Sequence, residues 1–144
     1  MQLSMTGEYA IQAMIFLAEL PIGKTIQISE ISKKRNIPES LLRKIVSQLR
    51  KLGLIFSTRG KSGGITLSRS ADLITLLDII ESTEGKIYLN KCLIGSEFCN
   101  RINMCAVHSV WKTVQNQMTN TLSEATLASL VSKEKQLKKY KIGG

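Results

Sequence analysis

Residues 27–52 carry the signals of two helices joined by a tight turn: Q-I-S-E-I-S-K-K-R-N-I-P-E-S-L-L-R-K-I-V-S-Q-L-R-K-L. Residues 27–35 predict a short helix, and Asn36 after it tolerates the left-handed backbone that a tight turn needs. Ile37 is forced into an extended conformation by Pro38, which then suits the start of the second helix. This arrangement is typical of a helix-turn-helix.

The second helix has one apolar and one polar face when its residues are placed at 100° per residue. We expect its apolar face to turn inward with Leu41, Leu42, Ile45, Leu49 and Leu52. The polar side makes it a candidate recognition helix, whose possible DNA-contacting residues are Glu39, Ser40, Arg43, Lys44, Ser47 and Arg50. An arginine at position 43 favours the O6 and N7 atoms of guanine.

Two β-rich runs follow, residues 54–58 and 65–68, and a glycine-rich tip joins them. The pattern predicts a β-hairpin of the kind called a wing in DNA-binding domains. Glycines let the backbone approach phosphates closely, and an arginine can enter a minor groove. The candidate DNA-contacting residues of the wing are Arg59, Gly60, Lys61, Gly63 and Gly64.

Positive charge is concentrated in this region. The formal net charge of the chain is +9, and nine lysines and arginines between positions 33 and 61 face a single acid, Glu39. A generally basic surface would spread its cations, whereas these gather where phosphates of a duplex would lie. We therefore expect double-stranded DNA to be the partner.

The remaining chain predicts further helices around this unit. A helix is expected over residues 3–20 and another over residues 72–83, with Leu73, Leu76, Leu77 and Ile80 buried. Residues 106–122 predict a long helix with an apolar stripe, which is the best candidate for a dimer interface. That stripe consists of Val107, Val110, Trp111, Val114, Met118 and Leu122.

These patterns predict a mostly α fold with a small β-hairpin: a winged helix-turn-helix domain plus a long dimerisation helix. We expect the DNA-binding domain over residues 1–84, a cysteine-rich loop over 85–105, the dimerisation helix with a short terminal helix over 106–132, and a loose basic tail over 133–144. No run of eighteen apolar residues predicts a membrane span, and the first residues do not resemble a signal peptide. A cytoplasmic location is therefore expected.

All three cysteines and the one histidine of the chain lie within seventeen residues: Cys92, Cys99, Cys105 and His108. An odd number of cysteines in a reducing compartment favours metal ligands or reactive thiols over a disulfide framework. Structural zinc sites usually use closer cysteine pairs, so these longer gaps favour an iron–sulphur cluster over zinc. Redox-active thiols without a metal stay an open alternative.

Several segments together resemble the bacterial iron–sulphur regulators of the IscR, NsrR and RirA group. The resemblance covers residues 1 to about 131. It rests on M-Q-L-S-x-x-G-E-Y-A at the start, I-P-E-S-L-L-R-K-I in the recognition helix, R-G-x-x-G-G in the wing, and C-A-V-H-x-x-W with T-L-A-S-L after the cysteines. The wing together with three cysteines at this spacing is a specific combination.

The resemblance implies a homodimeric transcription regulator that binds an inverted-repeat operator and holds one cluster per subunit through Cys92, Cys99 and Cys105. In IscR-like members a histidine at the position of His108 completes a 2Fe–2S site. In NsrR-like members a carboxylate from the partner subunit completes a 4Fe–4S site, and Glu8 is placed for that role. The complete C-x-x-H-x-x-W context favours His108 and a 2Fe–2S cluster.

Two features depart from the IscR pattern. The spacer between the first two cysteines is one residue longer than expected, and Arg43 stands where IscR is expected to have an acid, so the operator should differ. The alternative function is a winged-helix regulator without a cluster, which senses through cysteine oxidation or a small molecule. An enzyme is not expected, because the Cys105 and His108 pair has no orienting acid beside it.

Overall fold

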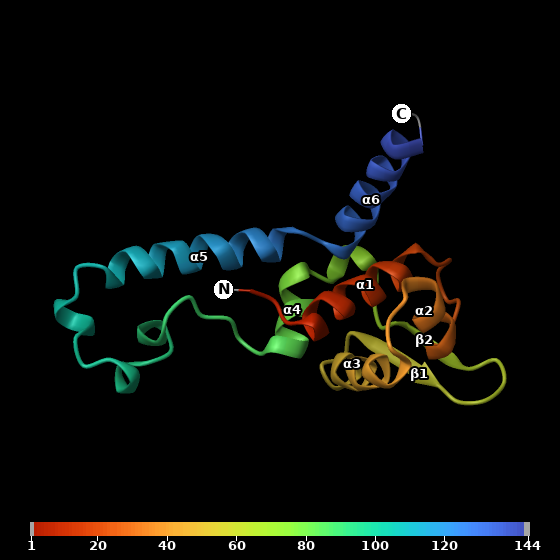
Figure 1. Cartoon of the computed structure of the whole chain (residues 1–144), viewed down its shortest axis with the longest axis horizontal. Coiled ribbons are helices and arrows are strands. Elements are labelled where there is room, and N and C mark those ends of the chain that lie inside the picture. The colour runs from red at the N-terminus through yellow and green to blue at the C-terminus, as the bar shows by residue number, and fades with distance from the viewer. Residues whose placement is uncertain (1, 143–144) are drawn as a thin grey trace.

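The computed structural model describes residues 2–142, which form a helical body and an arm that extends from it (Figure 1). The helices and strands are α1 (Met5–Glu19), α2 (Ile28–Arg35), α3 (Glu39–Lys51), β1 (Ile55–Thr58), β2 (Gly64–Leu67), α4 (Leu76–Glu84), α5 (His108–Glu124) and α6 (Leu127–Ile142). Single-turn 3₁₀ helices cover Ala71–Leu73, Lys91–Leu93, Ser96–Phe98 and Ile102–Met104. The predicted fold class, mostly α with a two-stranded antiparallel hairpin, is confirmed.

The turn between α2 and α3 forms as the sequence predicts. Asn36 has left-handed backbone angles of φ 53° and ψ 49°. The Ile37 amide donates to the Ser32 carbonyl at 3.0 Å, and the Ile37 side chain is buried. Pro38 then precedes the first residue of α3, so the chain enters the recognition helix at a fixed angle.

The apolar face of α3 packs inward through Leu42, Ile45 and Leu49, each at most 1% exposed. Val46 is also buried, although the predicted face did not include it. The prediction for Leu52 is wrong, because this residue follows the last helical turn and is 56% exposed. The outward face of α3 carries none of these buried side chains.

The wing is a two-stranded antiparallel hairpin in which Ile55 pairs with Leu67 and Thr58 pairs with Gly64. A third segment joins it, since Ile26 makes an isolated bridge with Ile65. The Ile26 amide donates to the Ile65 carbonyl at 3.1 Å, and the Ile65 amide donates back at 2.8 Å. The hairpin is therefore attached to the chain just before α2.

The helix predicted over residues 72–83 begins later than expected. Thr75 caps α4: its hydroxyl accepts from the Asp78 amide at 3.1 Å, and the Asp78 carboxylate accepts from the Thr75 amide at 2.9 Å. This reciprocal capping box fixes the start of α4, so the residues before it form a separate 3₁₀ turn. As a result Leu73 is 61% exposed, against prediction, and Ile74 takes the buried place.

The C-terminal prediction also needs correction. In place of a short helix and a loose tail over residues 133–144, α6 is a continuous helix that runs to Ile142. It docks on the body because Leu127 and Val131 enter the core, and Glu134 pairs with Arg35 of α2 at 3.5 Å. Residues 143 and 144 of the predicted tail lie outside the described residues.

The core surrounds α1, which packs against α3, α4 and α6. Met14 from α1, Leu42 from α3, Ile79 from α4 and Leu127 from α6 are all fully buried in one cluster. The long helix predicted over residues 106–122 is observed as α5, two residues later at each end, and it contributes no buried residue. It forms the arm together with the cysteine-rich segment (Figure 1).

The end of the arm is bonded to the segment just before α4. Thr126 bridges to Thr75, the Leu76 amide donates to the Ala125 carbonyl at 2.8 Å, and the Leu127 amide donates to the Ile74 carbonyl at 2.8 Å. The connection from α5 to α6 is therefore fixed by backbone hydrogen bonds on both sides. Among the described residues, no helix combines the length and the hydropathy that a bilayer crossing requires.

Candidate nucleic-acid interface and cysteine pocket

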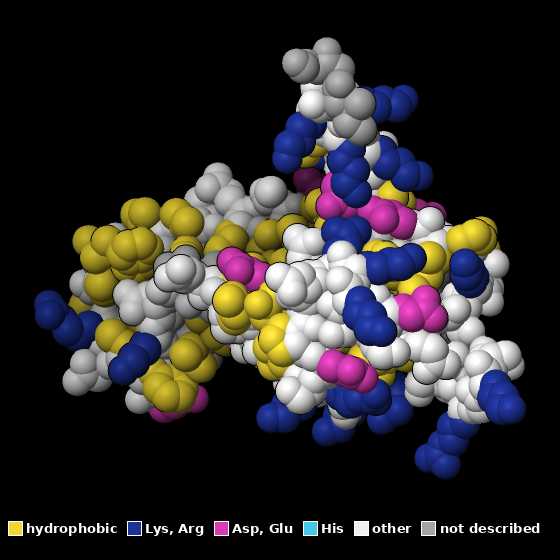
Figure 2. Space-filling model, turned by 45° about the vertical axis from the view of Figure 1, so that its right-hand side comes forward, with side chains coloured by type: hydrophobic (Ala, Val, Ile, Leu, Met, Phe, Trp, Pro, Cys, Tyr) yellow, Lys and Arg dark blue, Asp and Glu magenta, His cyan; other side chains and the backbone are white. Residues whose placement is uncertain are grey.

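The outer face of α3 carries the predicted DNA-contacting side chains. Glu39, Ser40, Arg43, Lys44 and Arg50 are exposed, and Ser47 is half-buried. In the space-filling view, lysine and arginine side chains gather along the lower edge of the body and on α6 (Figure 2). The cations of the recognition helix are thus free to meet an anionic surface.

Arg43 is paired within its own helix. Its Nη2 lies 2.7 Å from Glu39 Oε1, one helical turn earlier, and both side chains are about half exposed. An exposed pair of this kind is worth at most about 1 kcal/mol, so it orients the guanidinium without locking it. Arg50 instead reaches the wing, where its Nη1 donates to Ser57 Oγ at 3.1 Å.

The wing tip has the backbone that its glycines predict. Gly60 has φ +108° and Gly64 has φ +150°, both in the region that favours glycine. The Gly63 amide donates to the Gly60 carbonyl at 3.0 Å and closes a turn in which Arg59 and Lys61 are exposed. The tip therefore presents two cations on a short, folded loop.

A hollow of about 290 Å³ lies between α3 and the wing. Arg43 and Arg59 both line it, although they lie sixteen positions apart in the chain, and no acidic residue does. Gln27 and Ile28 from the start of α2 complete one wall. We did not predict them as site residues from the sequence, because we placed only the residues of α3 on a polar face. The fold thus brings the recognition helix and the wing to one basic surface.

The four predicted metal ligands line a second cavity, of about 370 Å³, in the arm. Its wall includes Cys92, Cys99, Cys105 and His108, and all three cysteines are free and half-buried. The remaining lining residues, which we did not predict as site residues, are Asn90, Lys91, Phe98, Ile102, Val107 and Trp111. Of these, Val107 and Trp111 had a sequence signal, since both belong to the C-A-V-H-x-x-W motif and to the apolar stripe.

His108 is the first residue of α5, and its Nδ1 atom is buried without a hydrogen-bond partner. A buried, unpartnered imidazole nitrogen beside three thiols is the donor set that suits a soft metal centre. Within residues 2–142, however, no three such side chains converge closely enough to hold a metal ion. The residues fit a metal group by their chemistry and shared cavity, while ligation would require them to move closer.

The alternative ligand Glu8 lies elsewhere. It stands in the first turn of α1, is exposed, and does not line the cysteine cavity of its own chain. It could reach such a cavity only from a second subunit.

Helix-turn-helix, wing and basic outer face together define a DNA-binding regulator of the winged-helix class. The Rrf2 family, described as iron-dependent transcriptional regulators, matches residues 3–133, so the chain belongs to that family. Its members and relatives are transcriptional regulators, and an enzymatic role is not indicated.

Named relatives agree with this assignment. The HTH-type transcriptional regulator IscR of Erwinia tasmaniensis is 32% identical over 137 residues, which cover 95% of this chain and 82% of the relative. The solved structure of CymR, the global cysteine regulator of B. subtilis, is similar with a TM-score of 0.75, 31% identity, and coverage of 92% and 97%. T. potens IscR has a TM-score of 0.74, 28% identity, and coverage of 93% and 88%.

Proposed function

We propose that this regulator is a homodimer whose binding to operator DNA is controlled by an iron–sulphur cluster at Cys92, Cys99, Cys105 and His108. The observation that carries the proposal is the single cavity lined by three free thiols and an imidazole with a buried, unpartnered Nδ1. When bound, the cluster supplies a centre that iron shortage, oxidants or nitric oxide can remove or modify. Similarity to proteins named IscR supports this cofactor class.

We favour a 2Fe–2S cluster with His108 as the fourth ligand. His108 lines the cavity, whereas Glu8 does not in the same chain, so a 4Fe–4S site completed by Glu8 needs a second subunit. His108→Ala and Glu8→Ala, purified without oxygen, distinguish the two. The variant that lacks the true fourth ligand should show an altered visible spectrum, and the other should match the wild type.

The cavity lies where it can influence the dimer helix, because His108 begins α5. Any change in how the cysteines and His108 are held therefore acts on the start of that helix. Coupling between two sites of this kind is typically about 1–3 kcal/mol, or some 5–150-fold in DNA affinity. The direction of that coupling follows from measuring operator affinity with and without the cluster.

The experiment that tests the cofactor is purification under anaerobic conditions, followed by visible spectroscopy and assays of iron and acid-labile sulphide. We expect a coloured wild-type protein, a colourless Cys99→Ala variant, and a coloured Ser96→Ala control, since Ser96 is exposed in the same segment. A colourless wild-type protein without iron would overturn the cluster.

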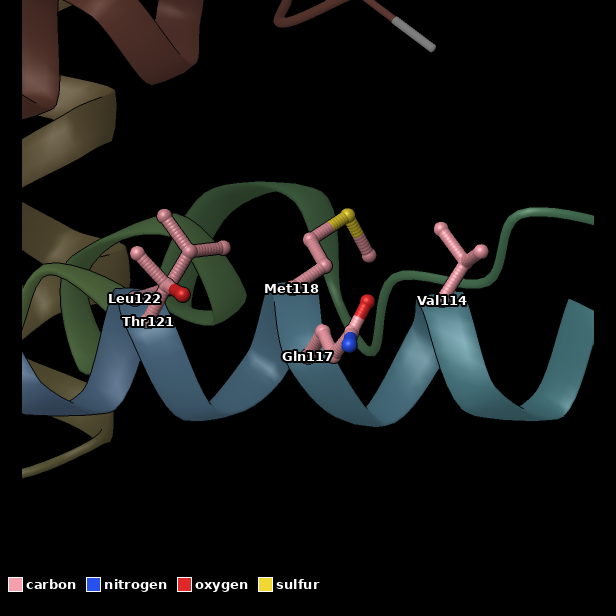
Figure 3. A pocket seen from close by; sticks show the side chains of 5 residues that line it. All are labelled: Val114, Gln117, Met118, Thr121 and Leu122. Atoms are coloured by element: carbon pink, nitrogen blue, oxygen red, sulfur yellow. The ribbon is translucent and has the colours of Figure 1, made fainter.

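The dimer is proposed to form through α5. Val107, Val110, Trp111 and Val114 are each 37–53% exposed, an unusual amount for apolar side chains spaced along one helix. Figure 3 shows Val114, Met118 and Leu122 projecting from the same side of α5, around a shallow pocket of about 340 Å³. A helix-turn-helix dimer spans two half-sites about one turn of DNA apart, as an inverted repeat provides.

On DNA, α3 is proposed to enter a major groove through Arg43 while Arg59 of the wing enters the adjacent minor groove. Arg59→Ala should weaken binding to all operators, and Arg43→Ala should relax discrimination at one base pair by about 1–3 kcal/mol. Lys86→Ala, an exposed cation outside the interface, is the control for general charge. Wild-type binding by both interface variants would contradict this groove assignment.

A second candidate function is sensing by the thiols themselves. It is supported by three free cysteines that line one cavity and by the similarity to a structure named as a cysteine regulator. Two thiols would form a disulfide, losing two electrons and two protons to an oxidant such as hydrogen peroxide, which becomes water. In the metal-free protein, oxidation would then lower the mass by about 2 Da and change the affinity for the operator. If dithiothreitol reverses both changes, this mechanism is favoured over the cluster.

A further inference from the structure

The wing loop is held by two side chains that precede α2. Thr25 Oγ1 donates to the Ser62 carbonyl at 3.0 Å, and Gln27 Nε2 donates to the Gly63 carbonyl at 2.6 Å. Both acceptors belong to the glycine-rich tip between Arg59 and Gly64. We propose that Thr25 and Gln27 are positioning residues that hold the wing in the conformation in which Arg59 meets DNA; this rests on the groove assignment proposed above.

The geometry follows from the extended backbone of residues 25–27. Ile26 bridges to Ile65, so this segment runs beside β2 as a short third strand. Side chains alternate along an extended chain, so Thr25 and Gln27 share one side and Ile26, 5% exposed, takes the other. One backbone bridge thereby directs two side-chain donors at the same loop.

The glycines at the base of the tip make this approach possible. A Cβ atom at Gly64 would overlap the Ile26 carbonyl oxygen, and a Cβ at Gly63 would overlap the Thr58 carbonyl oxygen. The second and third glycines of R-G-x-x-G-G thus serve close packing between the wing, residue 26 and the end of β1. Their role extends beyond backbone approach to phosphates.

Without the two donors, the backbone hydrogen bond from Gly63 to Gly60 is the one bond within residues 59–63 that the described structure shows. Glycine-rich loops lose much conformational freedom when they become ordered, and an interface that must order such a loop on binding loses affinity. A wing that is already ordered in the free protein avoids that cost. The hydrogen bonds from Thr25 and Gln27, which we call the tethers, also connect the wing to the start of α2, because Gln27 directly precedes α2.

The test compares Thr25→Val and Gln27→Met, which keep side-chain size and remove the donors, with Thr25→Ser, which keeps the hydroxyl. The probe is a duplex selected by the wild-type protein from a random-sequence library. Each donor-free variant should bind it about five-fold more weakly, since a neutral hydrogen bond contributes about 1 kcal/mol net. Thr25→Ser should bind as the wild type does, and all three variants should have thermal midpoints above the temperature of the binding assay, so that each is folded when its affinity is measured.

A double-mutant cycle with Arg59→Ala separates positioning from a general structural effect. If the tethers act through Arg59, Thr25→Val should cost much less in the Arg59→Ala background than in the wild type. Amide order parameters of Gly60 and Gly63 should fall in the donor-free variants. If Thr25→Val and Gln27→Met bind DNA with full affinity, or if their effects add to that of Arg59→Ala, the positioning role of Thr25 and Gln27 is overturned while the groove assignment stands. If Arg59→Ala binds with full affinity, the groove assignment is overturned, and the positioning role with it.

Discussion

The helical body and the arm are stabilised in different ways. Every buried apolar side chain of the described residues lies in residues 10–80 or in α6, and the stretch from residue 81 to 126 contains none. The body therefore holds itself together by its own core, while the arm leaves Val110 and Trp111 in solvent. The difference teaches that the described arm has no core of its own, which fits the second subunit and the metal centre proposed above.

The largest expected effect concerns the body. Leu42→Ala should lower the free energy of unfolding by about 2–5 kcal/mol, because Leu42 is fully buried and the substitution leaves a cavity. Ile22→Ala, at an apolar side chain that is completely exposed, should change it by no more than about 0.5 kcal/mol. Urea unfolding followed by circular dichroism measures both, and similar losses would show that the body is not the main source of stability.

The second prediction concerns the arm. Val114→Asp should raise the dissociation constant of the dimer at least 30-fold, about 2 kcal/mol, since a carboxylate would be buried in the apolar stripe of α5. Asn116→Asp adds the same charge to an exposed position about 200° away around the helix and should have little effect. Sedimentation at several concentrations measures the dimer. Equal dissociation constants for the two variants would move the interface away from α5.

The third prediction addresses the contact that joins α6 to the body. Arg35 pairs with Glu19 at 3.3 Å and with Glu134 at 3.5 Å, and its guanidinium lies 5.5 Å from the Phe16 ring centre. Arg35→Gln should cost about 1–3 kcal/mol of stability, because two facing carboxylates would lose their cation. Lys138 forms longer pairs, at 3.9 Å, and its side chain is 58% exposed, so Lys138→Gln should cost under about 1 kcal/mol. A larger loss than for Arg35→Gln would contradict this ranking.

The smallest effect is on the pH dependence of stability. Burial and the hydrogen bond with Glu134 raise the pKa of Glu19, although Arg35 and Lys138 oppose the rise. The pKa of Glu134 is held below its ordinary range, because hydrogen bonds with Glu19 and Arg35 outweigh burial. Folded Glu19 therefore keeps its proton more tightly than unfolded Glu19, and wild-type stability falls as pH rises above the ordinary pKa of about 4.5.

Glu19→Gln removes this titration, so its stability relative to the wild type should increase with pH, by less than about 1 kcal/mol. For Glu134 the sign is opposite and the window lies lower: its lowered pKa stabilises the wild type as pH rises toward the ordinary value of about 4.5, so Glu134→Gln should lose stability relative to the wild type over that rise. Thermal midpoints measured on both sides of this ordinary pKa, from about pH 3 to 7, test both. Parallel curves for the two variants would contradict the opposite pKa shifts of Glu19 and Glu134.

Much of the body could be predicted because local signals agreed with the tertiary packing. Asn36 and Pro38 set the turn before α3, and the glycines around Arg59 set the wing. The start of α4 was misplaced because both Asp72 and Thr75 can cap a helix, and only the reciprocal bond from Asp78 decides between them. The lysine-rich end was expected to be loose, since Glu134 pairs with Arg35 and Lys138 pairs with Glu19, which lie 99 and 119 residues earlier in the sequence.

The candidate sites were predictable to a different extent. The clustering of three cysteines and His108 indicated a shared cavity, and the structure places all four around one. The choice between His108 and Glu8 as fourth ligand involves a second subunit for Glu8, so no pattern within one chain decides it. The contacts of Thr25 and Gln27 with the wing depend on a bridge between Ile26 and Ile65, a long-range pairing that neither segment signals alone.

The bonds at the end of the arm give α4 a mechanical position. Its C-terminal end continues into the cysteine segment, and the residues at its N-terminal end hold Ala125 and Leu127. Both roots of the arm are thus anchored on one nine-residue helix, about 13 Å apart. Because α4 packs against α1 and α3, a rearrangement around the thiols that moved either root would act on the core of the body through α4.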